Sequence, residues 1–194
     1  MPFEVRPADV FEDVRQIIGP KRPDATVCWC LSYRIPSRLN NELRGPARGE
    51  AVAELCAREL APGVLAYEDD VPVGWAGVAP RAELNSFSRP NSLIPRVDDL
   101  PVWTVWCFRT RAGHRGRGIA HALLAGAVDF ARAHGAPAIE GYPVDNRGAR
   151  VDLTMAYVGT RALFERAGFE KAADTPSVLA GFPRVLMRLP LTAG

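Results

Sequence analysis

Glycine and arginine are concentrated between residues 108 and 120, and their spacing there points to the binding of an anion. The segment follows a strand-like run at 102–107 and precedes a helix-like run at 119–134. Glycines at positions 113, 116 and 118 let the backbone turn tightly and approach a ligand, because no Cβ intervenes. The free N–H groups that begin a helix attract anions, and four arginines add positive charge. Together these features predict a pyrophosphate-binding turn.

Other readings of this turn share parts of the same pattern. The spacing of Gly113 and Gly118 fits a P-loop, but the lysine and hydroxyl residue that should follow are absent. Residues 116–121 begin like a dinucleotide fingerprint, yet His121 stands where the third glycine belongs. Glu140 lies about 20 residues further on, as a ribose-binding acid would, so a nucleotide-dependent oxidoreductase stays open. An ordinary glycine loop with solvated arginines is the remaining alternative.

Two segments resemble signatures of the GCN5-related N-acetyltransferase (GNAT) superfamily. Residues 115–120 read R-G-R-G-I-A and are followed by two leucines, as in the family's acyl-CoA loop, although Gly113 replaces the usual Gln or Arg. Residues 163–169 read L-F-E-R-A-G-F and are similar to the end of the family's late helix. The resemblance implies acetyl-CoA as acyl donor. It implies that these residues bind it: Phe108, Arg109, Thr110, Arg115, Gly116, Arg117, Gly118, Ile119 and Ala120.

The order of the elements around these segments predicts an α/β (α+β) fold. Hydrophobic periodicity predicts strands at 3–7, 64–68, 73–78, 102–108, 138–144, 169–171 and 184–189. It predicts helices at about 9–18, 50–60, 119–134 and 160–167. This order gives a mixed sheet with helices against it. The resemblance implies a GNAT-like, mostly antiparallel, twisted sheet of six to seven strands flanked by about four helices, in one domain spanning residues 1–194.

Acyl transfer to an amine needs a proton donor for the departing thiolate. The family often places a Tyr four residues before the late-helix glycine, but that residue is Phe164 here. The family's usual Asn, seven residues earlier, aligns with Tyr157. The hypothesis is therefore that Tyr157 or water reprotonates the thiolate. The alternative is that Tyr157 packs a loop against the helix.

Candidates for the base and a nucleophile lie on two neighbouring strands. Glu140 falls in mid-strand beside Tyr142, where a half-buried carboxylate could have a raised pKa and accept the amine's proton. Glu140 could equally be a structural acid paired with an arginine. Cys107 precedes the glycine turn, but no base is tied to it in sequence and a buried cysteine usually packs.

An aromatic segment lies at residues 28–33, before the helix predicted at about 50–60. Residues 28–30 read C-W-C, and Tyr33 follows in the region where the family builds its acceptor pocket. Trp29, Tyr33 and Tyr142 are therefore the candidate substrate-binding residues, and residues 26–34 and 80–100 are expected to flank the acceptor's entrance. The alternative is that these aromatics belong to the core.

Composition excludes several other classes of protein. The net charge of +2 is too small to indicate nucleic-acid binding, and no apolar run is long enough for a membrane helix. The N-terminus has no signal-peptide pattern, so the cytoplasm is expected, with the four cysteines as free thiols. The histidine and cysteine spacing predicts no metal site. Oligomeric state stays open, with a homodimer as one option.

The function predicted from the sequence is transfer of an acetyl or other short acyl group from acyl-CoA to a small-molecule or peptide amine, directly in a ternary complex. A non-catalytic CoA-binding or regulatory domain on the same fold is the alternative, because the usual tyrosine is missing at position 164.

Overall fold

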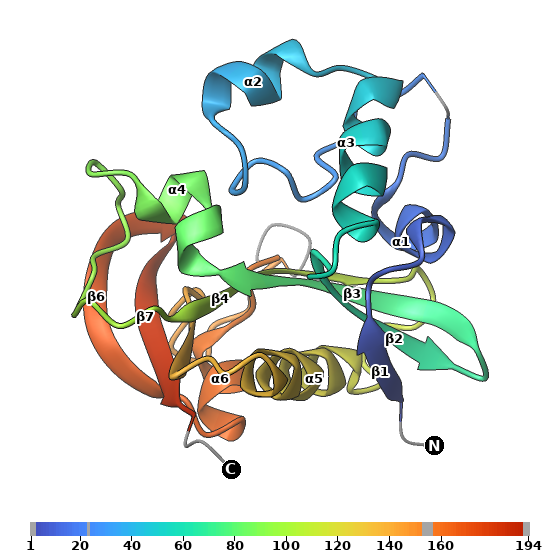
Figure 1. The fold of residues 1–194 in the computed structure, drawn as a ribbon. Coiled ribbons are helices and arrows are strands. Elements are labelled where there is room, and N and C mark those ends of the chain that lie inside the picture. Colours follow the sequence, from blue (N-terminus) through green and yellow to red (C-terminus); the bar gives the residue numbers. More distant parts are fainter. Residues whose placement is uncertain (1–2, 23, 153–156, 192–194) are drawn as a thin grey trace.

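One seven-stranded sheet forms the centre of the molecule, with strand order β1-β2-β3-β4-β5-β7-β6 (Figure 1). The computed structural model describes residues 3–22, 24–152 and 157–191. The strands are β1 (Glu4–Pro7), β2 (Gly63–Glu68), β3 (Val71–Pro80), β4 (Trp103–Thr110), β5 (Ala138–Gly141), β6 (Glu170–Leu179) and β7 (Phe182–Pro190). Neighbouring strands are antiparallel except β4 and β5. The prediction of a mixed, mostly antiparallel sheet is confirmed.

The parallel pair β4 and β5 stays together for only part of its length. Pairing runs from Trp103 with Ile139 to Val105 with Gly141, where β5 ends. Strand β4 continues to Thr110, paired with β3 on its other side. One edge of residues 106–110 is therefore free of β5, so the sheet opens at this point.

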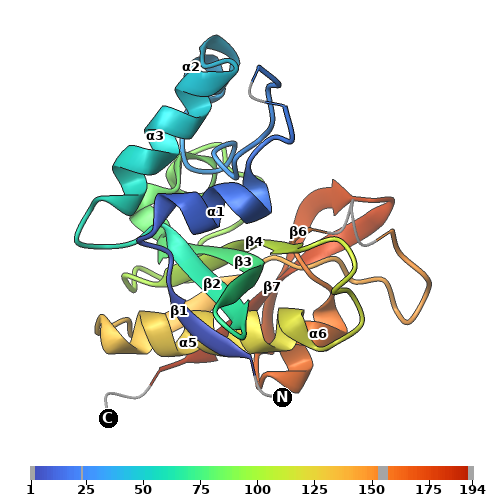
Figure 2. The ribbon, with the colours of Figure 1, turned by 90° about the vertical axis from the view of Figure 1, so that its right-hand side faces the viewer.

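Helices cover both faces of the sheet, as the two ribbon views show (Figures 1 and 2). One face carries α5 (Ile119–Ala133) and α6 (Arg161–Arg166), and the other carries α1 (Phe11–Ile18), α2 (Ser37–Glu42), α3 (Pro46–Cys56) and α4 (Asn85–Ser88), the last after a short 3₁₀ helix, Arg81–Glu83. Each face has its own hydrophobic cluster. The sheet therefore separates two cores.

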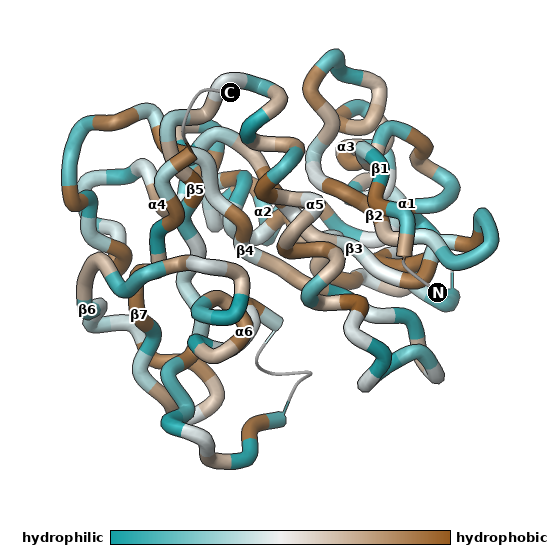
Figure 3. The backbone as a smooth tube through the Cα atoms, turned by 90° about the horizontal axis from the view of Figure 1, so that it is seen from below, coloured by the Kyte–Doolittle hydropathy of each residue, from teal (hydrophilic) through white to brown (hydrophobic). Residues whose placement is uncertain are grey.

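Helix α5 is the element that holds the glycine turn against the sheet. The helix was predicted at 119–134, and its buried apolar residues recur at helical spacing: Ile119, Leu123, Leu124, Ala127, Phe130 and Ala131. Figure 3 shows this helix as a hydrophobic segment beside β4. Gly118, with φ +87°, precedes the helix and Gly135, with φ +72°, follows it, because both ends need a left-handed turn that glycine adopts without strain.

The described part of the chain has six α-helices where about four were expected. The two that the periodicity does not predict are α2 and α4, and each lies between two prolines of the sequence. Arg48 explains how α2 is fixed, because its buried guanidinium donates to the carbonyls of Leu43 and Val27, each at 2.8 Å, and to that of Asn40. Short helices held by one distant side chain leave no periodic signal. No helix in the described part of the chain is long and apolar enough to span a bilayer.

Candidate active site

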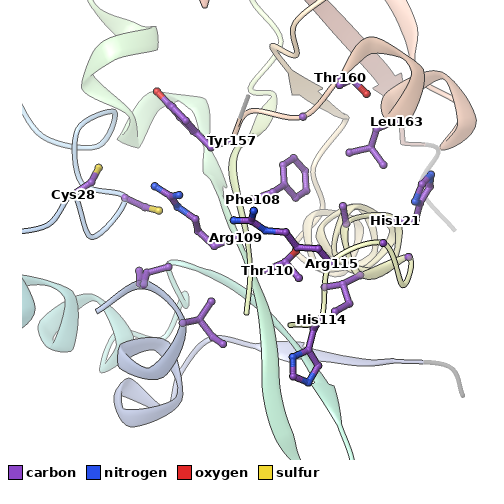
Figure 4. Close-up of a pocket in the computed structure, with 18 of the residues that line it drawn as sticks. Cys28, Phe108, Arg109, Thr110, His114, Arg115, His121, Tyr157, Thr160 and Leu163 are labelled. Carbon is purple, nitrogen blue, oxygen red and sulfur yellow. The ribbon is translucent and has the colours of Figure 1, made fainter. Parts of the chain in front are cut away.

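A cavity of about 680 Å³ opens where β4 and β5 part (Figure 4). It extends from the glycine turn, past the end of β4, to the segment before α2. Its lining residues are 17–19, 27–30, 108–110, 114–116, 118–121, 157, 159–160, 163 and 166. The volume falls within the range of small-molecule sites, and eight of the nine predicted CoA-binding residues line it.

The glycine turn (residues 113–118) has the backbone that its sequence predicted. Gly113, Gly116 and Gly118 have φ of +84°, +78° and +87°, in the left-handed region. A Cβ at any of the three would meet no atom within 4 Å. Glycine is therefore needed for conformation and for the approach of a ligand, and not to avoid a neighbour. Ile119 and Ala120, whose N–H groups begin α5, line the cavity beyond the turn.

The arginines of this segment divide between the cavity and the protein itself. Arg115 lines the cavity, and no ion pair to it is found among the described residues. Arg117 turns away, because its guanidinium binds the carboxylate of Glu68, at 2.9 Å to Oε2. That bond holds the pKa of Glu68 below its usual value. Arg111 donates to the carbonyl of Pro72 at 3.1 Å. Arg115 is thus the arginine side chain of the turn that is available to a pyrophosphate.

The end of β4 supplies the middle of the cavity wall. Phe108, Arg109 and Thr110 all line it, as predicted. The N–H of Phe108 donates to the carbonyl of Tyr157 at 2.7 Å. The free edge of β4 is thereby tied to the segment that precedes α6. The N–H of Phe108 therefore has its hydrogen-bond partner within the chain.

Tyr157 belongs to a hydroxyl pair at the far end of the cavity. Its Oη lies 2.8 Å from that of Tyr33. A guanidinium nitrogen of Arg184, Nη1, reaches the Tyr33 hydroxyl at 3.5 Å. Burial, and next the neighbouring Tyr33, raise the pKa of Tyr157 well above its usual range. The phenol is protonated at neutral pH, as it would be at its ordinary pKa, and the raised pKa makes it a weaker acid.

Glu140 lies apart from the cavity in a network of arginines. The carboxylate is fully buried and pairs with Arg81 at 3.0 Å and Arg188 at 2.5 Å. The Tyr142 hydroxyl donates to it at 2.9 Å. Neither Glu140 nor Tyr142 is among the described residues that line the cavity. This placement favours the structural alternative for Glu140 and places Tyr142 in the core.

The C-W-C segment enters the site in a strained conformation. Trp29 and Cys30 have φ of 50° and 54°, values that cost energy for any residue with a side chain. Cys28, Trp29 and Cys30 line the cavity, whereas Tyr33 meets it through the hydroxyl of Tyr157. The expected entrance residues 80–100 do not line it among the described positions.

The cysteines are free, and two of them touch. The Sγ atoms of Cys30 and Cys107 lie 2.9 Å apart in the buried region behind the cavity. This hydrogen bond, and next burial, raise the pKa of the Cys30 thiol well above its usual range. A thiol that resists ionisation is a poor nucleophile. Cys30 and its neighbour Cys107 therefore serve packing better than covalent catalysis.

Phe164 occupies the position of the tyrosine that is usual in the family, and it faces the core. It is fully buried, and a Cβ on Gly141 would lie 2.1 Å from its ring. Its ring also meets those of Phe108 and Phe169 edge-on. The ring thus fills the space where β5 ends and supports the opening of the sheet.

Several cavity residues carried no distinct signal in the sequence. His114 and His121 line it near the turn, and Thr160, Leu163 and Arg166 line it from α6 and the residue before it. The late-helix resemblance covers two of these but assigned them no role. Among the described residues, no group of three or more side chains is arranged to hold a metal ion.

The chain matches the family model of the acetyltransferase (GNAT) family over residues 33–169. It also resembles solved structures with TM-scores above 0.5. An N-acetyltransferase from Staphylococcus aureus Mu50 shares 18% identity at a TM-score of 0.57, covering 99% of this chain and 100% of that one. A GCN5-related N-acetyltransferase from Kribbella flavida shares 19% identity at a TM-score of 0.53, covering 97% of this chain and 98% of that one. A phosphinothricin acetyltransferase from Sinorhizobium meliloti, solved with acetyl-CoA, shares 19% identity at a TM-score of 0.54, covering 100% of this chain and 91% of that one. No curated protein matches significantly.

The matched family model defines the class of this protein, an acyltransferase. The chain belongs to the acetyltransferase (GNAT) family, whose model covers most of its length. Membership confirms the class predicted from the sequence, an enzyme that moves an acyl group from acyl-CoA to an amine.

Proposed function

We propose that this enzyme transfers an acetyl or other short acyl group directly from CoA to an amine while both substrates are bound. One observation carries the proposal: a single cavity is lined by the glycine turn, by Tyr157 and by residues 28–30. The turn and Arg115 would bind the pyrophosphate, and the free edge of β4 would lie along the pantetheine. Donor and acceptor would then meet near Arg109 and Tyr157.

In the proposed reaction the amine nitrogen attacks the thioester carbonyl carbon. An N–C bond forms, the C–S bond breaks, and the sulfur leaves with the electron pair. The nitrogen loses one proton and the thiolate gains one, so that an amide and free CoA result. No Asp or Glu is found among the described cavity residues, so the proton would leave through water. The nearby guanidinium of Arg109 supports this route, because a cation disfavours the ammonium form of the amine.

The hydroxyl pair supports Tyr157 as the donor of the second proton. Arg184 has only donors, so the oxygen of Tyr33 accepts from it. Either hydroxyl of the pair can donate to the other, because the Tyr33 oxygen has two lone pairs. The proposal takes the arrangement in which Tyr33 donates to Tyr157, which leaves the Tyr157 proton free for transfer. Transfer of the Tyr157 proton to the CoA thiolate would let the protein, and not water, protonate the leaving group.

The proposal also covers the domain organisation of the chain and its cellular compartment. Residues 1–194 would act as a single catalytic domain, since one sheet joins β1 near the beginning with β7 near the end. A cytoplasmic setting is supported by the free thiols. The acceptor is an amine, on a small molecule or a peptide.

Calorimetric titration with acetyl-CoA, CoA and NADH, followed by thiol release with amines, tests the proposal. We expect micromolar binding of acetyl-CoA and thiol release that depends on the amine. Binding of NADH in preference to both CoA species would refute it, and acetyl-CoA binding without thiol release would favour a non-catalytic role.

The role of Tyr157 has its own matched pair of variants. Tyr157→Phe removes the proposed acid and should lower kcat by about 100-fold, the lower end for general acids. Tyr33→Phe leaves the Tyr157 hydroxyl in place and should change kcat less than about fivefold. If kcat in Tyr157→Phe equals that of the unchanged protein, Tyr157 is not the acid.

A further inference from the structure

The acceptor end of the cavity (Cys28, Trp29, Cys30, Arg109 and Tyr157) holds a positive charge with no acidic partner. The side chain of Arg109 is half-buried, and no ion pair or hydrogen bond to its guanidinium is found among the described residues. Most arginines in the described chain have carboxylate or carbonyl partners. An arginine held in a binding site without a partner is arranged for an anion from outside.

The direction of Arg109 points to the acceptor. Figure 4 shows its guanidinium extending from β4 toward Cys28 and Tyr157, away from the glycine turn. The guanidinium lies over the Tyr157 ring, 5.9 Å from the centroid, and its charge also lowers the pKa of the Cys30 thiol in part. These contacts hold the cation at the C-W-C segment. Arg115, on the glycine turn, is the cation proposed for the pyrophosphate.

A second cation deepens the positive potential at this end. Arg184 is 5% exposed, and its guanidinium lies 5.8 Å from the centroid of Tyr33. Its Nε donates to the carbonyl of Tyr142 at 2.8 Å, whereas its Nη2 has no partner. Arg184 thus contacts the Tyr33 hydroxyl and Arg109 lies over the Tyr157 ring, and no carboxylate is found among the described cavity residues.

We propose that the acceptor is an amine that carries a carboxylate, of the free α-amino-acid type, and that the side chain of Arg109 binds this carboxylate. The inference rests on the proposed acyltransferase function and adds the class of its acceptor. A planar guanidinium takes a carboxylate through two parallel hydrogen bonds. With the carboxylate fixed at Arg109, the α-amine one carbon away is directed toward the thioester. The products are an N-acyl amino acid and CoA.

The test uses matched pairs of acceptors, each L-amino acid other than cysteine against its C-terminal amide. Amidation removes a negative charge and makes the amine easier to deprotonate, so a preference for the free acid is not one of intrinsic reactivity. We expect at least one free acid to exceed its amide by about 10- to 100-fold in kcat/KM, as for a charged hydrogen bond. Amides that match or exceed every free acid would overturn the proposal and leave the acyltransferase function standing.

Two variants locate the preference. Arg109→Gln removes the cation near the amine for both acceptors, so the readout is the ratio of kcat/KM for the free acid to that for the amide. This ratio should fall by about 10- to 100-fold. The affinity of this variant for acetyl-CoA should stay unchanged, which also reports correct folding. Arg115→Gln is the control, and it should weaken acetyl-CoA binding and lower both acceptors equally.

The outcomes separate the two proposals. If acetyl-CoA binds but no free amino acid gives a product, the amino-acid acceptor is refuted. If Arg115→Gln loses the preference for the free acid over its amide and Arg109→Gln keeps it, the role of Arg109 is refuted. Failure to bind either CoA species would instead refute the acyltransferase function itself.

Discussion

Arg115 and Arg117 stand two residues apart in the glycine turn, yet the structure assigns them different partners. Arg115 faces the cavity, whereas Arg117 pairs with Glu68. We expect Arg115→Ala to weaken acetyl-CoA binding and the removal of the Arg117 pair to leave it nearly unchanged. The sequence alone treats the two as equivalent, so the comparison tests the structure directly.

The magnitude follows from the bond that Arg115 would make. A hydrogen bond to a charged group contributes about 1.5–3 kcal/mol, and Arg115 is exposed, so salt screens it toward the lower value. About 1.5–2 kcal/mol corresponds to an increase of about 10- to 30-fold in Kd. Raising the ionic strength should reduce this difference between Arg115→Ala and the unchanged protein.

The control removes both partners of the surface pair. Arg117→Ala alone would leave the Glu68 carboxylate unpaired near the anion, so the double variant Glu68→Gln with Arg117→Gln is the matched comparison. Calorimetric titration at two salt concentrations should give this variant a Kd within about threefold of the original, as for an exposed pair. A double variant weaker than Arg115→Ala would show that the placement of these arginines is wrong.

Three further predictions concern the groups around the cavity. Phe164→Tyr should not raise kcat and should lower the free energy of unfolding by about 1–3 kcal/mol, because the added hydroxyl would point at Gly141 in the core; a gain in turnover would contradict this. Iodoacetamide should modify Cys28, which is exposed and lines the cavity, before Cys30 and the other thiols, and acetyl-CoA should slow that reaction. Mass mapping that found Cys30 modified first would reverse this assignment. The raised pKa of Tyr157 stabilises the folded protein fully below about pH 10, where the unfolded phenol is also protonated. Above that pH only the unfolded chain loses the proton, so stability falls, and Tyr157→Phe should show a shallower fall in denaturation between about pH 9 and 11.

The glycine turn and α5 were predictable because their signals are local. A left-handed φ at Gly116 and Gly118 requires glycine whatever lies around it, and the apolar face of α5 repeats at helical spacing along one segment. The strand that precedes the turn was predictable for the same reason, because its apolar run lies in one short segment.

The partners of the charged and hydroxyl groups were not predictable, because they come from distant parts of the chain. Glu140 meets Arg81 across 59 residues and Arg188 across 48, and Tyr33 meets Tyr157 across 124. Sequence spacing identified Glu140 as either a base or one half of an ion pair, and only the register of β5 with β7 decides which partner it faces. The roles of such residues follow from the sheet topology and not from a motif.

The departure at Phe164 and the presence of Tyr157 have a common physical explanation. Gly141 ends β5, and the ring of Phe164 takes the space that a side chain there would need. A hydroxyl at position 164 would meet this packed core and would have no route to the cavity. Tyr157 instead lines the cavity, where its backbone carbonyl accepts a hydrogen bond from the Phe108 N–H on the free edge of β4. In the proposed mechanism the same opening between β4 and β5 therefore accommodates the donor and brings in the acid, so that loss of the usual tyrosine need not abolish catalysis.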